Sequence, residues 1–178
     1  PQSICPMPWL LPTLQSVVNR ITLPALHSFV ESVLADDGIS FAFVSAPASL
    51  NHHHNYPGGL LVHSLECVSM VGKHREFDRT SYELGIVAAL FHDLGKILTL
   101  TYQMERTSLG HSRNHDKLTL EVLDPYLKQL EQDWPQGADE LRYSLTWKLR
   151  KPVPRYNMAD LVACCDRLSS GFDRQRRA

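Results

Sequence analysis

Cysteine, net charge and long hydrophobic runs are what this sequence has little of. The 178 residues contain only four cysteines and no CxxC pair, which argues against a disulfide framework or a zinc finger and suits a reducing compartment. No apolar run approaches the roughly 20 residues of a membrane-spanning helix, and the N-terminus lacks the basic stretch of a signal peptide. The formal net charge of −1 provides no global attraction to nucleic acid, so any such contact must be local. We therefore expect a cytoplasmic protein without membrane insertion.

Composition and hydrophobic spacing predict a helical domain. With 43% hydrophobic and 21% charged residues, the chain can bury a core of ordinary size. Apolar residues recur at helical spacing in the segments 10–36 (two helices joined near Thr22), 60–74, 81–96, 112–132, 138–150 and 157–172. By contrast, "ISFAFVSAPAS" (39–49) indicates an extended or irregular segment, and "ILTLTYQ" (97–103) a short strand. We expect an all-α helical bundle with at most one minor β-hairpin.

His92 and Asp93 stand side by side at the end of a segment that is otherwise apolar. An unpaired imidazole and carboxylate in such a place would cost several kcal/mol, so both need partners. A divalent metal would satisfy both, whereas a His–Asp pair that caps the helix end is the simpler alternative. His63 on the preceding helix and Asp166 in the terminal helix extend the pair to four groups and favour the metal. Asp160 competes with Asp166, but it also fits a capping box with Asn157.

The ordered set His63…His92-Asp93…Asp166, with "HDLGK" at 92–96, resembles the HD-domain superfamily of metal-dependent phosphohydrolases over residues 40–170. A closer resemblance rests on "APASLNHHHNYPGGLLVHSLE" (46–66) and on Gly110-His111. These motifs resemble the subgroup that includes bacterial 3′→5′ exoribonucleases and the N-terminal domain of TraI-like (MobH-type) relaxases of integrating conjugative elements, often labelled putative helicases. The resemblance implies cleavage of a DNA phosphodiester at a transfer origin, with DNA and other conjugation proteins as partners. No Gly-x-x-x-x-Gly-Lys-Ser/Thr loop for ATP is present.

The resemblance also implies the ligands. His63, His92, Asp93 and Asp166 would hold Fe, Mn or Zn, with Mg as a further possibility, and a second ion would use His111 and one of His53 or His54. His52 and His115 are weaker candidates, although His111 and His115 are four residues apart and would share a helical face. Exposed histidines without a site role are the alternative for both. Gly58 and Gly59 would let the chain turn close to a bound phosphate.

Lys96 and Asp93 are the expected catalytic residues. In a hydrolase, the metal supplies a hydroxide nucleophile, Lys96 neutralises developing charge, and Asp93 bridges or orients. In a relaxase, Tyr56 is the best-placed alternative nucleophile. A local nucleic-acid patch would use Lys73, Arg75, Arg79, Lys96, Arg113 and Lys117, and a second cluster contains Lys148, Arg150, Lys151 and Arg155. A nucleotide phosphohydrolase and a non-catalytic, metal-stabilised module remain alternatives.

The domain organisation follows from the position of these motifs. We expect one domain with a helical extension (1–50), a core that carries the metal site (51–170) and a linker (171–178) to a further C-terminal region. The absence of an initiator methionine and the ending "FDRQRRA" suggest that the chain is part of a longer protein.

Overall fold

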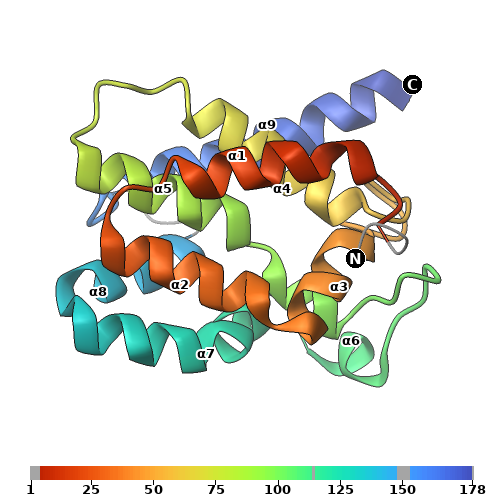
Figure 1. The fold of residues 1–178 in the computed structure, drawn as a ribbon. Helices are drawn as coiled ribbons and strands as arrows, with labels where there is room; N and C mark the ends of the chain where they lie inside the picture. The colour runs from red at the N-terminus through yellow and green to blue at the C-terminus, as the bar shows by residue number, and fades with distance from the viewer. Residues whose placement is uncertain (1–4, 114, 148–152, 178) are drawn as a thin grey trace.

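The computed structural model describes residues 5–113, 115–147 and 153–177, and this part of the chain contains helices and no sheet (Figure 1). The helices are α1 (Leu11–Asn19), α2 (Pro24–Ala35), α3 (Asp37–Ser45), α4 (Gly59–Val71), α5 (Arg79–Phe91), α6 (Ser108–Ser112), α7 (His115–Asp133), α8 (Pro135–Thr146) and α9 (Asn157–Arg177). Two 3-10 turns, η1 (Pro8–Leu10) and η2 (Leu94–Leu98), complete the described elements. The expected all-α fold is therefore confirmed. None of the described helices combines the length and apolar character that crossing a membrane requires.

Helix α5 is the centre of the bundle. Every residue from Glu83 to Phe91 is buried, and the helix packs against α4, α8 and α9. A helix that is apolar all round can only be stable inside a core, so its sequence places it there. As a consequence, the His92-Asp93 pair that follows Phe91 emerges in the interior.

The N-terminal helices belong to the same core. The Phe91 ring contacts Phe29 of α2 and Phe43 of α3, with ring centroids 6.2 and 6.1 Å apart. Helix α7 packs against α2, α8 and η2, and Figure 1 shows α2 and α7 side by side along the lower edge of the molecule. The hydrophobic core is thus continuous from α1 to α9.

The expectation of an extended or irregular segment at 39–49 is wrong for most of its length, because α3 runs to Ser45. The Asp36 carboxylate caps this helix by accepting hydrogen bonds from the backbone of Gly38 and Ile39, at 2.9 and 3.0 Å. Ile39 and Phe43 lie one helical turn apart and are both buried. The sequence pattern indicates an extended or irregular segment, but burial of one helical face decided the conformation.

The short strand expected at 97–103 is also wrong. Helix η2 continues to Leu98, and within the described residues the only pairing is an isolated antiparallel bridge between Leu100 and Arg106. Helix α5 is capped by Asp78, whose carboxylate accepts a hydrogen bond from the Ser81 backbone at 3.1 Å.

Candidate metal centre

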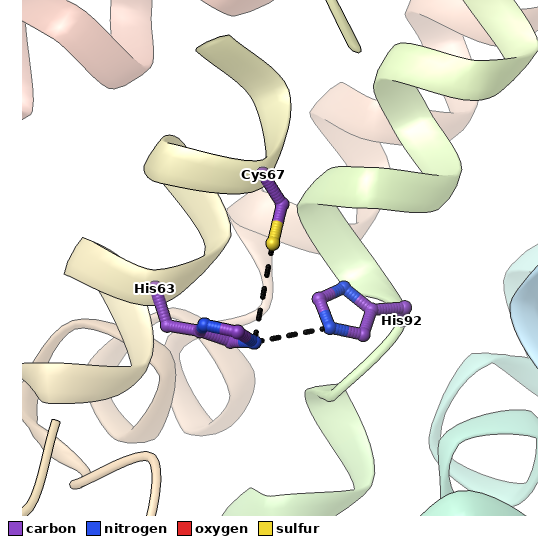
Figure 2. A group of neighbouring side chains, drawn as sticks. All are labelled: His63, Cys67 and His92. Carbon is purple, nitrogen blue, oxygen red and sulfur yellow. Dashed lines mark hydrogen bonds between the residues drawn. The ribbon is translucent and has the colours of Figure 1, made fainter. Parts of the chain in front are cut away.

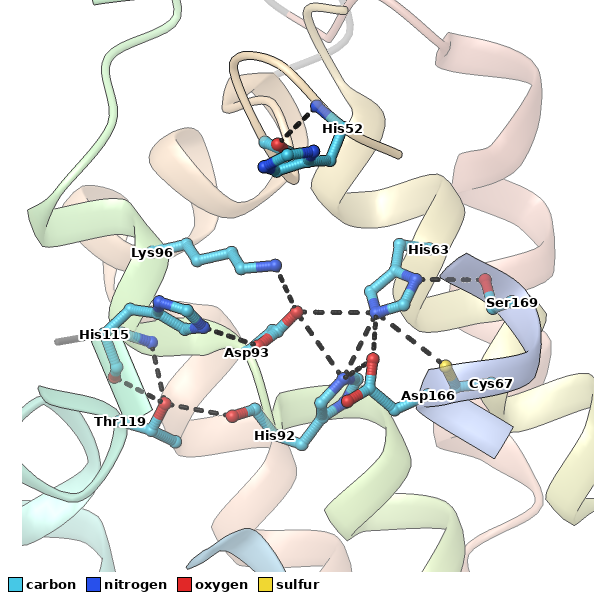
Figure 3. A network of polar contacts seen from close by, with 12 residues as sticks. His52, His63, Cys67, His92, Asp93, Lys96, His115, Thr119, Asp166 and Ser169 are labelled. Atoms are coloured by element: carbon cyan, nitrogen blue, oxygen red, sulfur yellow. Dashed lines mark hydrogen bonds and ion pairs between the residues drawn. The ribbon is translucent and has the colours of Figure 1, made fainter. Parts of the chain in front are cut away.

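Four side chains from different parts of the chain meet at the end of α5. His63 comes from α4, His92 and Asp93 follow α5, and Asp166 comes from α9; we call this set the four-donor cluster (Figure 3). The His63 Nε2 atom lies 3.2 Å from His92 Nε2, 3.4 Å from Asp93 Oδ2 and 3.2 Å from Asp166 Oδ1. The His92 Nε2 atom lies 3.6 Å from Asp93 Oδ2 and 3.7 Å from Asp166 Oδ1.

These separations fit a metal ion. Tetrahedral ligands at bond lengths of about 2.0–2.2 Å are about 3.3–3.6 Å from one another. The five distances around the four-donor cluster, 3.2 to 3.7 Å, bracket that range. His63, His92 and Asp93 are buried and Asp166 is partly buried, so the ion would be held mainly by protein ligands. Imidazole and carboxylate together suit borderline divalent metals.

Hydrogen bonds behind the two imidazoles determine which ring nitrogens face the cluster. His92 Nδ1 donates to the Ala89 carbonyl at 2.9 Å, so the neutral ring carries its lone pair on Nε2. Ser169 donates its hydroxyl proton to Glu66 Oε2 at 2.7 Å, and its oxygen therefore accepts from His63 Nδ1 at 3.0 Å. Neutral His63 likewise presents a lone pair on Nε2. The two Nε2 atoms face each other at 3.2 Å in a buried site. In the metal-free protein a proton on His63, hydrogen-bonded to the carboxylates, separates them, and a bound metal ion would take the place of that proton.

The carboxylates make the cluster a site of negative potential. Burial would lower the pKa of His63, but hydrogen bonds to Asp166 and Asp93 outweigh it and hold that pKa well above its ordinary value. Burial would raise the pKa of Asp93, but the charges of Lys96 and then His92 outweigh it and hold it well below its usual range. The pKa of Asp166 is lowered by its hydrogen bonds to the two histidines despite burial. Both carboxylates are therefore ionised and favour a bound cation.

Lys96 reaches the cluster from η2. Its ammonium is buried and lies 2.5 Å from Asp93 Oδ2, the oxygen that also faces the histidines. On the other carboxylate oxygen, Asp93 Oδ1 lies 3.5 Å from His115 Nε2 of α7. Asp93 thus contacts Lys96 and His115 besides the histidine donors His63 and His92, and Figure 3 shows Lys96 and His115 on the same side of it.

The histidine run, residues 52–54, lies next to the four-donor cluster. His54 is fully buried, its backbone N–H donates to Asp173 of α9 at 2.8 Å, and its Nε2 lies 3.3 Å from Glu66 Oε2. The His53 ring centroid lies 5.1 Å from that of His63, and burial, with the Lys96 charge, lowers the pKa of His53 to about 4. Its Nε2 is buried with no hydrogen-bond partner among the described residues. Exposed His52 faces the cluster across an open space (Figure 3).

Gly58 and Gly59, which follow the histidine run, are needed for the backbone conformation and for close packing. Gly58 has φ of +80°, a conformation that L side chains rarely adopt. A Cβ on Gly59 would collide with the His54 carbonyl oxygen. The close approach at Gly59 is therefore between the histidine loop and α4, and the expected approach to a bound phosphate stays a prediction. It holds the loop against the start of the helix that carries His63.

The other residues predicted for the site lie at different distances from the four-donor cluster. His115 lies beside Asp93, whereas His111 is exposed on α6 and lines neither of the two cavities next to the cluster. Tyr56 lies against His54, with ring centroids 6.0 Å apart. Asp160 accepts a hydrogen bond from the Trp147 indole at 3.0 Å, so Asp166 alone of the two competing carboxylates joins the donors. The metal-binding roles of these residues stay predictions.

Sequence reasoning missed Cys67. Its thiol is fully buried one helical turn after His63, and Sγ lies 4.0 Å from His63 Nε2 (Figure 2). With His63 and His92 it forms a second group whose donor atoms could hold an ion. Burial raises the pKa of this thiol in the absence of a metal. The i,i+4 spacing from His63 was the available sequence signal.

The predicted basic patch is not gathered at the cluster. None of Lys73, Arg75, Arg113 and Lys117 lines the two adjacent cavities. Arg75 lies in a separate cavity between α1, α4 and α5, with its guanidinium 4.7 Å from the centre of the Tyr82 ring. Arg113 pairs with Glu121 at 3.0 Å. Of the second cluster, Lys148, Arg150 and Lys151 lie outside the described residues, and Arg155 pairs with Asp139 at 3.0 Å.

Fold and site together define an all-α protein with a buried histidine–carboxylate cluster that could hold a metal ion. Residues 39–106 match the model of the TraI_2 family, which is described as "Putative helicase". The match covers less than half of the 178 residues; it includes His63, His92 and Asp93 but not Asp166. No curated protein and no solved structure matches the chain significantly. The match supports the similarity to TraI-like proteins.

Proposed function

We propose that this protein is a metal-dependent phosphodiesterase domain that cleaves DNA, acting as the relaxase-type part of a conjugative transfer protein. The observation that supports this most is the four-donor cluster, in which the Nε2 atoms of two imidazoles face the same point between two ionised carboxylates. The similarity of residues 39–106 to a TraI-like family supports the context of conjugation. The chain has no phosphate-binding loop for ATP, so the helicase description of that family is not extended to it.

His63, His92, Asp93 and Asp166 would hold the ion. A divalent ion there would supply Lewis-acid chemistry, polarising a phosphoryl oxygen and activating water. Lys96 holds Asp93 in place and puts a buried positive charge next to the reacting phosphate, where charge develops in the transition state. His115 supports the other oxygen of Asp93. His53, which burial keeps neutral, lines the cavity beside the donors.

The test compares two aspartates on the same helix. Asp166→Asn removes one donor from the cluster. Asp160→Asn makes the identical change at a carboxylate that accepts a hydrogen bond from Trp147 and lies outside the four-donor cluster. The protein is reconstituted with Mn²⁺ or Zn²⁺ and assayed for nicking of single-stranded DNA and for hydrolysis of mononucleotides. We expect metal-dependent nicking that Asp166→Asn reduces by about 100-fold or more and Asp160→Asn leaves nearly unchanged.

Two outcomes would contradict the proposal. Efficient mononucleotide hydrolysis without cleavage of DNA would make the protein a nucleotide phosphohydrolase. Failure of the reconstituted protein to retain any divalent metal, measured by elemental analysis, would remove the basis of the proposed chemistry.

A further inference from the structure

A cavity of about 420 Å³ opens directly beside the four-donor cluster. Asp93 and Asp166 line it on one side, and His52, His53, Lys96 and His115 line it as well. The remaining wall is formed by α9, which contributes Arg167 and Arg174. Neither arginine stood out in the sequence, because each is one of many charges in a polar C-terminal segment.

The two arginines form a row that leads away from the cluster. They are seven residues apart, or about two helical turns and about 10 Å along one face of α9. Arg167 follows Asp166 directly, while Arg174 lies near the C-terminal end of the helix. Both side chains are exposed. The positive charges therefore begin at the predicted metal ligands and continue outward along the cavity wall.

These charges are not neutralised within the described part of the chain. Five other arginines there, Arg79, Arg113, Arg142, Arg155 and Arg176, pair with carboxylates, whereas the ion pairs found among the described residues include neither Arg167 nor Arg174. In a protein with a net charge of −1, the two arginines give the α9 wall of this cavity a local positive charge, beside the ionised Asp93 and Asp166 that favour a metal ion. A guanidinium matches the geometry of phosphate oxygens and binds them bidentately.

The spacing favours a chain of phosphates over a single one. Arg174 lies two turns beyond Arg167, so the two guanidinium groups come from backbone positions about 10 Å apart on the wall of one cavity. A strand whose successive phosphates pass the cluster, Arg167 and Arg174 would use all three. The donors lie beside a cavity that His52 also lines, and a flexible single strand bends into such a recess at lower cost than a stiff duplex.

We infer that Arg167 and Arg174 bind the backbone phosphates of a single-stranded polynucleotide and guide it along α9 to the four-donor cluster. This inference rests on the proposed function and replaces the predicted patch of Lys73, Arg75, Arg113 and Lys117 as the main contact surface. Because phosphate contacts carry no base specificity, the strand would be held without regard to its sequence.

The test is equilibrium binding of a fluorescein-labelled oligodeoxythymidylate of about 12 nucleotides, followed by fluorescence anisotropy in EDTA. The double variant Arg167→Gln/Arg174→Gln is compared with Arg142→Gln/Arg155→Gln, which loses the same charge away from the cavity. We expect the first pair to weaken binding about tenfold or more and the second to change it less than twofold. Each lost phosphate contact should reduce the slope of log K against log salt by about 0.7, so the first pair should reduce it by about 1.4.

Equal losses in both double variants would show an effect of net charge alone and would overturn the inference. It would also be overturned by wild-type protein that does not bind the oligonucleotide at low salt, or that binds deoxythymidine monophosphate as tightly. The assay needs no metal and no turnover. If binding depends on Arg167 and Arg174 but the protein does not nick DNA, the inference holds and the proposed function is rejected. If the protein nicks DNA but Arg167→Gln/Arg174→Gln binds the oligonucleotide like the wild type, the proposed function holds and the inference is rejected.

Discussion

The hydrogen-bond relay Glu66–Ser169–His63 should control metal affinity. Ser169 accepts from His63 Nδ1 at 3.0 Å and donates to Glu66 Oε2 at 2.7 Å. Burial alone would raise the pKa of Glu66, but hydrogen bonds from His54, Ser169 and Arg176 lower it to about 2. Glu66 is thus an obligatory acceptor, and Ser169 can only orient its hydroxyl proton toward it. Ser169→Ala removes the group that keeps the His63 lone pair on Nε2.

The magnitude follows from the loss of this partner. Removing a hydrogen bond behind a ligating histidine costs about 10–100-fold in metal affinity, or about 1.4–2.7 kcal/mol. The variant also leaves the buried His63 Nδ1–H without an acceptor, which should lower the free energy of unfolding by about 1–3 kcal/mol. Both effects should appear together, because the same hydrogen bond serves both.

The assay is competition for Zn²⁺ or Mn²⁺ against a chromophoric chelator, with urea denaturation of the metal-free protein beside it. Ser144→Ala is the matched control: Ser144 is also buried, but its hydroxyl has no hydrogen-bond partner within the described residues. It should bind metal like the wild type and be no less stable. Wild-type metal affinity in Ser169→Ala, or an equal loss in Ser144→Ala, would refute the reasoning.

Three further predictions concern acid stability, metal preference and close packing. Hydrogen bonds from Thr22 and the backbone of Leu23 outweigh burial and lower the pKa of Glu83, so its stabilising contribution is present above the ordinary pKa of 4.5 and is lost as the pH falls. Glu83→Gln should therefore be less stable near neutral pH, by about 1.5–3 kcal/mol, and lose less stability on acidification, as urea denaturation at several pH values would show. Cys67→Ser should weaken Zn²⁺ binding more than Mn²⁺ binding, because a thiolate favours the softer ion, and an unchanged ratio of the two dissociation constants would count against a role for the thiol. Gly95→Ala should destabilise the fold by about 1–3 kcal/mol in thermal or chemical denaturation, since its Cβ would meet the backbone of α7 at residues 115–119; wild-type stability would contradict this contact.

Much of the fold and the core of the candidate site could be predicted from local sequence. The apolar segment before His92 and Asp93 has no polar face, so it had to be a buried helix that carries this pair into the interior. The cost of leaving two polar side chains unpaired there pointed to further partners. His63 and Asp166 are indeed brought to them, at the distances a metal site requires. Whether a metal binds remains a prediction.

What only the tertiary structure decided is how the helices are rotated and which distant residues meet. The sequence favoured His111 over His115, yet of the two His115 is the one that lies beside Asp93, because α7 packs against η2 while α6 leaves His111 exposed. Asp160 and Asp166 lie on the same helix. The orientation of α9 decides that Asp160 accepts a hydrogen bond from Trp147 and that Asp166 joins the four-donor cluster. The sequence by itself determined the helical fold and the donor types, since propensity, periodicity and desolvation cost act locally. The meeting of α4, α5 and α9 depends on packing between residues about 100 positions apart, as between His63 and Ser169, and no local pattern encodes it.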